Sequence, residues 1–72
     1  MAQFHIYHSI GENMLKHVGF VEANSLEQAF QYSQNDHDDW HYYETRSTSV
    51  GDIIQSEDGF YMVRGMGFKF LG

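Results

Sequence analysis

Residues 3–23 read QFHIYHSIGENMLKHVGFVEA, and this stretch decides the fold. Its first eight residues alternate, so that one face of an extended chain carries Phe4, Ile6, His8 and Ile10 and the other carries His5, Tyr7 and Ser9. A period of two predicts a β-strand. Residues 11–13 suit a turn, and residues 15–23 are rich in side chains that fit a pleated sheet. We therefore expect an antiparallel hairpin.

A short helix is predicted directly after this hairpin. Ser25 suits the N-cap position, and Gln28 three residues later completes a capping box. Glu27 lies in the first turn, where a carboxylate interacts favourably with the helix dipole. Leu26 and Phe30 share one stripe and are expected to face the sheet, with the helix ending near residues 34–35.

The remaining chain predicts a loop and three more strands. Residues 35–48, NDHDDWHYYETRST, lack periodicity and are expected to form a loop anchored by Trp40, with Tyr42 or Tyr43 assisting. Strands are expected at residues 49–55, 60–64 and 68–71, with a turn at residues 58–59 and a bulge or bend around Met66. The fold class is therefore α+β: residues 1–72 form one domain, a small antiparallel sheet of order β-β-α-β-β-β with one helix packed on it.

Composition narrows the functional classes. A chain of 72 residues buries only about 60% of the surface that its unfolded form exposes, so its stability is marginal. The chain has no cysteine, which excludes disulfides, thiolate zinc sites and cysteine nucleophiles. Six Phe, five Tyr and one Trp supply the apolar surface for a core. Association with a partner or a second copy is a further route to stability.

The charge distribution argues against direct binding to nucleic acid. The net charge is −6, and no Lys or Arg occurs between Val18 and Thr45. A protein that binds a duplex needs a basic face to neutralise phosphates. The sequence also shows neither a targeting segment nor an apolar run long enough to span a membrane. We expect a soluble protein that acts where it is made.

Five histidines raise the question of a metal site. His5 and His8 are three apart on a strand and point to opposite faces. His37 and His41 are four apart, next to three acids, Asp36, Asp38 and Asp39. On a helix that spacing would place both imidazoles on one face. Because the segment does not look helical, a solvated acidic loop is favoured, and no cofactor or metal is expected.

Patterns that carry catalysis are absent. No spacing joins a nucleophile, a base and an orienting acid, and the phosphate-binding pattern Gly-x4-Gly-Lys-[Ser/Thr] does not occur. The segment Arg46–Ser49 precedes a predicted strand, where its hydroxyls can satisfy backbone groups. We expect it to build the sheet, with ligand binding by Arg46 and Ser47 as the alternative, and we expect no enzymatic activity.

The end of the chain resembles a known family. Residues 46–71, RSTSVGDIIQSEDGFYMVRGMGFKFL, resemble the C-terminal signature of small YodL-like proteins of phages and bacterial mobile elements. The matching residues are Arg46, Ser47, Ser49, Val50, Asp52, Ile53, Ile54, Tyr61, Val63, Gly67, Phe68, Lys69 and Leu71. The resemblance brings no catalytic residues with it. It implies an accessory protein that acts in the cytoplasm of a bacterial host.

Three functional hypotheses follow. The preferred one is a non-enzymatic module that binds and modulates, most simply by inhibition, a host protein. Its candidate interface residues are Trp40, Tyr42, Tyr43, Asp36, Asp38, Asp39, Glu44 and Met66. For Trp40, a place in the core is the alternative. The second hypothesis is an acidic mimic of nucleic acid that blocks a DNA-binding or anti-phage defence enzyme. The third is a self-assembling structural protein, such as a homodimer that shares the edge strand at residues 67–72.

Overall fold

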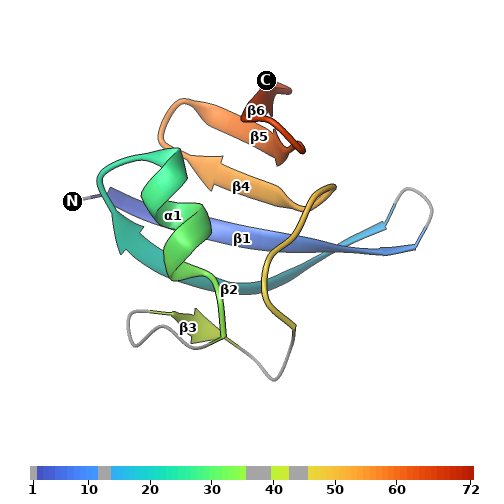
Figure 1. Cartoon of the computed structure of the whole chain (residues 1–72), viewed down its shortest axis with the longest axis horizontal. Coiled ribbons are helices and arrows are strands. Elements are labelled where there is room, and N and C mark those ends of the chain that lie inside the picture. Colours follow the sequence, from blue (N-terminus) through green and yellow to red (C-terminus); the bar gives the residue numbers. More distant parts are fainter. Residues whose placement is uncertain (1, 12–13, 36–39, 43–45) are drawn as a thin grey trace.

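The computed structural model describes residues 2–11, 14–35, 40–42 and 46–72, which form a single antiparallel sheet with a helix on one face (Figure 1). The elements are β1 (Ala2–Gly11), β2 (Met14–Ala23), α1 (Leu26–Tyr32), β3 (His41–Tyr42), β4 (Ile53–Ser56), β5 (Gly59–Val63) and β6 (Phe68–Phe70). The strand order is β3-β2-β1-β4-β5-β6. The α+β class and the five expected strands are confirmed. The two-residue strand β3, within the predicted loop, is an addition.

The hairpin of β1 and β2 is the centre of the sheet. Phe4, Ile6 and His8 are buried on the side of the sheet that carries α1, while His5 and Tyr7 lie on the opposite face, as the alternation predicts. Ile10 is exposed, although it continues the buried series. The reason is that β4 pairs with β1 only from His5 to Tyr7. The end of the hairpin therefore projects beyond the sheet (Figure 1).

The helix begins as its cap predicts. The backbone N–H of Gln28 donates to Ser25 Oγ over 3.2 Å, and Gln28 Oε1 accepts from the backbone N–H of Asn24 over 2.9 Å. Ala29 is buried against β2, and Leu26 and Phe30 pack on the core at its margin. The helix ends at Tyr32, slightly before the predicted end. Among the described residues, no helix is long and apolar enough to cross a membrane.

The core lies between α1 and the sheet. Its buried members are Phe4, Ile6, Val18, Val21, Ala23, Ala29, Trp40, Ile54 and Val63. Trp40 is only 4% exposed, and its indole N–H donates to Asn35 Oδ1 over 2.8 Å. Of the two alternatives that the sequence left open for Trp40, the structure shows the core position. A single large ring thereby joins the segment before β3 to the sheet.

The C-terminal strands form a meander on the free side of β1. β5 and β6 match the predicted strands to within two residues. β4 begins at Ile53 rather than at Ser49, so the expectation of a strand over residues 49–52 is wrong. Val50 and Gly51 form a turn there, because the carboxylate of Asp52 accepts the backbone N–H of Ser49 and closes the chain on itself.

Candidate partner-binding groove

The helix covers only part of its face of the sheet. It lies over β1 and β2, and β5 and β6 continue beyond it, where the described residues form no second helix (Figure 1). A groove of about 570 Å³ runs along this border. Its apolar walls come from Phe30 of α1, Val50 of the turn before β4, Val63 of β5 and Phe68 of β6. Glu27 and Arg64 lie at its rim.

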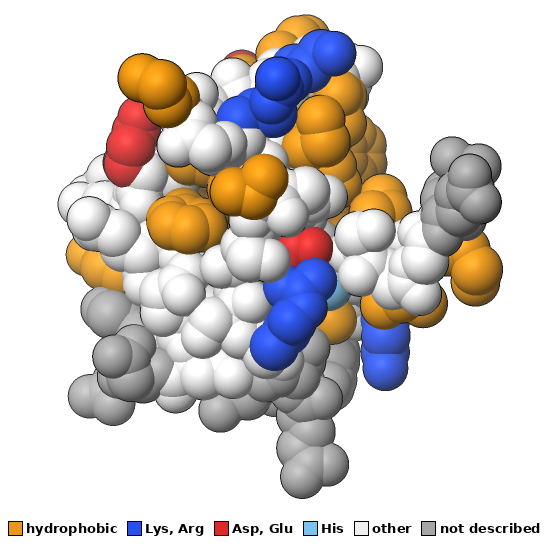
Figure 2. Space-filling view, turned by 45° about the vertical axis from the view of Figure 1, so that its right-hand side comes forward, with side chains coloured by type: hydrophobic (Ala, Val, Ile, Leu, Met, Phe, Trp, Pro, Cys, Tyr) orange, Lys and Arg blue, Asp and Glu red, His pale blue; other side chains and the backbone are white. Residues whose placement is uncertain are grey.

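Two strongly exposed apolar side chains belong to this groove and its border. Val50 lines the groove and is 64% exposed, and Met66 is 96% exposed. Gly65 and Gly67, on either side of Met66, also line the groove. Figure 2 shows hydrophobic side chains gathered in the upper part of the view, the part of the molecule in which β5 and β6 lie in Figure 1. An exposed apolar patch of this kind is typical of an interaction site.

The turn that presents Met66 is fixed by the backbone. The N–H of Arg64 donates to the carbonyl of Gly67 over 3.0 Å, which closes a tight connection between β5 and β6. This is the bend that the two glycines predicted. Because the turn is closed without help from the Met66 side chain, that side chain is left pointing into solvent beside the groove.

A second feature is a polar cluster under the loop before β4. Asp52 is 1% exposed, and its carboxylate accepts two hydrogen bonds from the Arg46 guanidinium. Arg46 Nη1 lies 2.6 Å from Oδ2, and Nη2 lies 2.8 Å from Oδ1. The backbone N–H of Ser9 donates to Oδ1 over 3.0 Å. His8 joins the same cluster, with its Nε2 3.8 Å from Asp52 Oδ2.

The cluster has shifted pKa values. Burial alone would raise the pKa of the Asp52 carboxyl, but hydrogen bonds from Arg46 and from two backbone N–H groups hold it below its ordinary value. Burial also lowers the pKa of His8; Asp52 opposes this, Arg46 adds to it, and the net shift is downward. His8 is therefore neutral near pH 7, beside an ionised and fully paired carboxylate.

The geometry of this cluster does not match a catalytic relay. In a relay the histidine contacts the nucleophile through one ring nitrogen and the orienting acid through the other. Here Nε2 of His8 lies 3.1 Å from Thr48 Oγ1, and the same atom lies 3.8 Å from Asp52 Oδ2. Thr48 is buried as well. The arrangement supports a structural role, in which the Arg46–Ser49 segment is held against β1.

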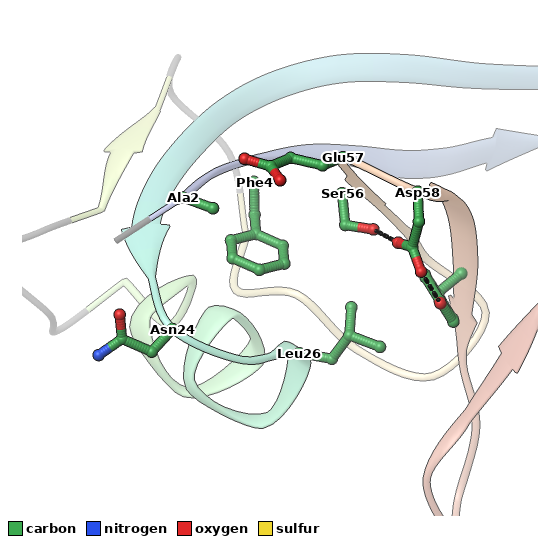
Figure 3. A pocket seen from close by; sticks show the side chains of 8 residues that line it. Ala2, Phe4, Asn24, Leu26, Ser56, Glu57 and Asp58 are labelled. Atoms are coloured by element: carbon green, nitrogen blue, oxygen red, sulfur yellow. Dashed lines mark hydrogen bonds between the residues drawn. The ribbon is translucent and has the colours of Figure 1, made fainter.

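A smaller hollow of about 350 Å³ lies on the other side of Leu26, toward the turn between β4 and β5 (Figure 3). Phe4 and Leu26 extend into it. On its rim the carboxylate of Asp58 accepts hydrogen bonds from the Ser56 and Tyr61 hydroxyls, which lower its pKa. Asp58 therefore serves to close the turn, as its predicted position at residues 58–59 suggests.

Of the sequence-predicted interface residues, only Trp40 and Met66 have side chains that the structure describes, so the predicted interface stays a prediction. Asp36, His37, Asp38, Asp39, Tyr43 and Glu44 lie outside the described residues. His41 and Tyr42 form β3, where only the backbone is described. Trp40 is in the core, and Met66 is exposed beside the groove. Within the part of the chain that the structure describes, no group of three or more His, Asp or Glu residues could hold a metal ion.

Sequence reasoning missed two things here. It did not single out Val50 and Phe68 as a shared wall, although an apolar residue between Ser49 and Gly51 in a turn is a signal of exposure. It also missed Asp52 as the acceptor that organises its loop. The Arg46 guanidinium donates to the Asp52 carboxylate, and Ser47 Oγ accepts from the backbone N–H of Asn35 over 2.8 Å. These internal contacts favour the sheet-building interpretation of Arg46 and Ser47 over ligand binding.

Comparisons with protein-family models, with curated proteins and with solved structures found no match. The resemblance of residues 46–71 to the YodL-like ending therefore stays a prediction.

Proposed function

We propose that this protein is a non-enzymatic binding module whose groove between α1 and β5–β6 accepts an amphipathic helix of a partner protein. The observation that carries the proposal is the uncovered apolar border of the sheet, where Val50 and Met66 are strongly exposed. Exposed apolar and aromatic side chains around a groove are the usual anchors of protein interfaces.

The shape of the site favours a helix as the occupant. One wall is the existing helix, through Phe30, and the floor is the sheet, through Val63 and Phe68. Helices on a sheet pack side by side at about 8–10 Å between axes, so a second helix beside α1 completes the layer that the chain leaves unfinished. Such a partner helix carries apolar side chains three and four residues apart along one face and buries them in the groove.

Charge favours a basic partner. The chain carries a net charge of −6, which attracts positively charged proteins and speeds their encounter. At the groove itself the charges are mixed, since Glu27 and Arg64 lie on its rim. The apolar walls then supply most of the affinity and the net charge supplies steering. Binding at the groove is accordingly less sensitive to salt than binding through acids alone.

The biological setting is part of the same proposal. The resemblance of the chain's ending implies an accessory protein of a phage or mobile element, so the partner is a host protein in the bacterial cytoplasm. A module of this size modulates such a partner by occupying a surface. The polar groups of the Arg46–Asp52 cluster are engaged internally, which agrees with action by binding rather than by catalysis.

The test begins with position 66. A photoreactive benzophenone amino acid placed there should cross-link to the partner inside bacterial cells, and mass spectrometry gives the captured segment. That segment is then synthesised and its affinity measured by calorimetry. We expect a basic amphipathic helix, with Val50→Glu weakening binding at least about 10-fold, which corresponds to about 1.4 kcal/mol.

Met14→Glu is the matched control. Met14 is 60% exposed, at the projecting end of the hairpin and outside the groove, and the substitution changes the charge equally. The affinity of the Met14→Glu variant for the captured segment should stay within about twofold of the wild type. The proposal fails if Val50→Glu binds as well as the wild type, or if the captured segment belongs to a second copy of this chain. Capture of a DNA-binding enzyme that is released by salt and indifferent to Val50→Glu would support the acidic mimic instead.

A further inference from the structure

The smaller hollow beside Leu26 combines an apolar, aromatic floor with an acidic rim (Figure 3). Its volume of about 350 Å³ lies near the lower end of the range for small-ligand sites. The side chains of Phe4 and Leu26 extend into it, and Tyr61 of β5 adds a second ring. Glu57 and Asp58 lie along its upper and right-hand edges in the view. Among the described residues that line the hollow there is no Lys, Arg or His, so its rim attracts cations.

The carboxylate of Asp58 is oriented for a ligand that donates hydrogen bonds. Its Oδ1 accepts from the Ser56 hydroxyl, and its Oδ2 accepts from the Tyr61 hydroxyl over 2.8 Å. An ionised carboxylate has about four acceptor positions, so these two bonds leave room for a further donor. The same hydroxyls lower the pKa of Asp58, which keeps its charge at neutral pH. Glu57 is exposed and supplies a second charge at the same rim.

These features favour a primary ammonium on an alkyl chain. An ammonium donates hydrogen bonds in three separate directions, so it can reach both carboxylates while its methylene groups lie on Phe4 and Leu26. The ring of Tyr61 adds a cation–π attraction. A guanidinium prefers a bidentate pair with one carboxylate, and both oxygens of Asp58 already accept a hydroxyl. A hard metal ion needs a full shell of oxygen ligands, which the apolar floor does not supply.

The hollow continues the border along which the groove lies. Tyr61 lines the hollow and Val63 lines the groove, and the two lie about 7 Å apart on one face of β5. Leu26 and Phe30 are related in the same way along α1, about 6 Å apart. One turn of a helix spans nearly the same distance. A partner helix with an apolar residue over Val63 therefore places a residue one turn away over the hollow.

We infer that the hollow binds a lysine side chain, which the partner helix carries one turn from its apolar residue over Val63. The methylene groups lie against Phe4 and Leu26, and the ammonium lies between Glu57 and Asp58. The origin of the lysine in that helix rests on the proposed function, whereas the chemical class of the ligand rests on the hollow alone. The basic partner thereby gains a specific contact in addition to steering by the net charge.

The first test uses the full chain and small model ligands, so it does not depend on the groove. Isotope-labelled protein is titrated with Nα-acetyl-lysine N-methylamide at neutral pH and low ionic strength, and the NMR signals of Leu26 and Tyr61 are followed. The norleucine amide has the same four-carbon chain without the charge, and the arginine amide carries a guanidinium. We expect saturable shifts with the lysine amide, binding at least about threefold weaker with the arginine amide, and no saturation with the norleucine amide.

Substitutions at the rim give the second readout. Glu57→Gln and Asp58→Asn should each weaken binding of the lysine amide about 2- to 5-fold, as expected for exposed ion pairs. Glu57→Gln leaves the hydrogen bonds of Asp58 in place, so this variant remains informative even where Asp58→Asn loosens the turn. Glu22→Gln makes the same change at an exposed acid outside the hollow and should stay within about 1.5-fold of the wild type.

The outcomes separate this inference from the proposed function. Lysine amide that binds no better than norleucine amide, or that ignores both rim substitutions, overturns the inference and leaves the groove proposal standing. In the captured segment, exchange of the lysine for norleucine should weaken binding about 2- to 5-fold in the wild type and less in Glu57→Gln. No effect of that exchange would also overturn the inference. Lysine amide binding that persists while Val50→Glu leaves the segment's affinity unchanged supports the lysine site and sinks the groove proposal alone.

Discussion

Replacing Asp52 by Asn tests whether the buried carboxylate holds the fold together. The groups facing it are all donors: Ser9 N–H and Arg46 Nη2 at Oδ1, and Ser49 N–H and Arg46 Nη1 at Oδ2. An Asn side chain keeps the shape but turns one end into a donor, which then faces two donors. It also leaves the guanidinium without its counter-charge.

The expected cost is large for so small a domain. The amide leaves one backbone N–H and one guanidinium N–H without an acceptor, and a hydrogen bond to a charged group typically contributes about 1.5–3 kcal/mol, so the loss of two is expected to cost about 3–6 kcal/mol. A domain of 72 residues has a total stability of roughly 4–11 kcal/mol at about 0.05–0.15 kcal/mol per residue. At about 4–8 °C per kcal/mol, Asp52→Asn should lower the melting temperature by at least about 12 °C. A variant that is already unfolded at room temperature lies at the upper end of this range.

Arg46→Ala should cost less, about 1–2 kcal/mol. The Arg46 side chain is 48% exposed, so solvent replaces part of the hydrogen bonding that Asp52 loses, and Asp52 keeps its two backbone donors. Urea unfolding followed by the fluorescence of Trp40, the single tryptophan, gives each free energy. Glu57→Gln makes the same chemical change at an exposed site and should stay within about 0.5 kcal/mol. The reasoning is refuted if Asp52→Asn costs under 1 kcal/mol or costs less than Arg46→Ala.

Three further predictions concern pH, a turn and the helix cap. Because the folded pKa of His8 lies below its ordinary value near 6.5, the unfolded chain takes up the proton more readily, so the free energy of unfolding should fall as pH drops below about 6.5. Urea melts at pH 7.5 and 5.5 measure this slope, and His8→Gln should flatten it; an unchanged slope would contradict the burial argument. Gly59→Ala should destabilise by about 1–3 kcal/mol, because φ is +142° and a Cβ would lie 2.8 Å from the Phe70 ring, whereas Gly65→Ala has open space and should cost under about 1 kcal/mol; equal thermal shifts would argue against the turn. Ser25→Ala should cost about 1 kcal/mol through loss of the cap, and a melting temperature within 1 °C of the wild type would show that the cap contributes nothing.

The sequence was informative where structure is local. Alternation over Phe4–His8 predicted both the strand and its buried side, and Ser25 with Gln28 predicted where the helix begins. These features depend on neighbours within a few residues. β3 was missed because two residues are too short to show a period.

The features that the sequence did not predict involve distant segments. Asp52 gathers donors from β1 and from the loop before β4, so its role depends on which strands become neighbours. The groove lies on the part of the sheet that α1 leaves uncovered. A sequence pattern shows which face of a strand is apolar, but it does not show which part of that face a helix will cover. His5 and His17 form a hydrogen bond across a hairpin whose register shifts after Ile6, which pattern reading does not anticipate.

The central position of β1 has a consequence for synthesis on the ribosome. The first strand to emerge is the one that must be flanked on both sides, and its second neighbour arrives about 48 residues later, when Ile54 pairs with Ile6. An isolated two-stranded hairpin is marginally stable in water. At about 5–20 residues per second, synthesis from Gly19, the β2 partner of Ile6, to Ile54 takes roughly 2–7 s, and during that time the nascent hairpin leaves Ile6 without its second neighbour. The sheet therefore closes around β1 only once the C-terminal meander has left the ribosome.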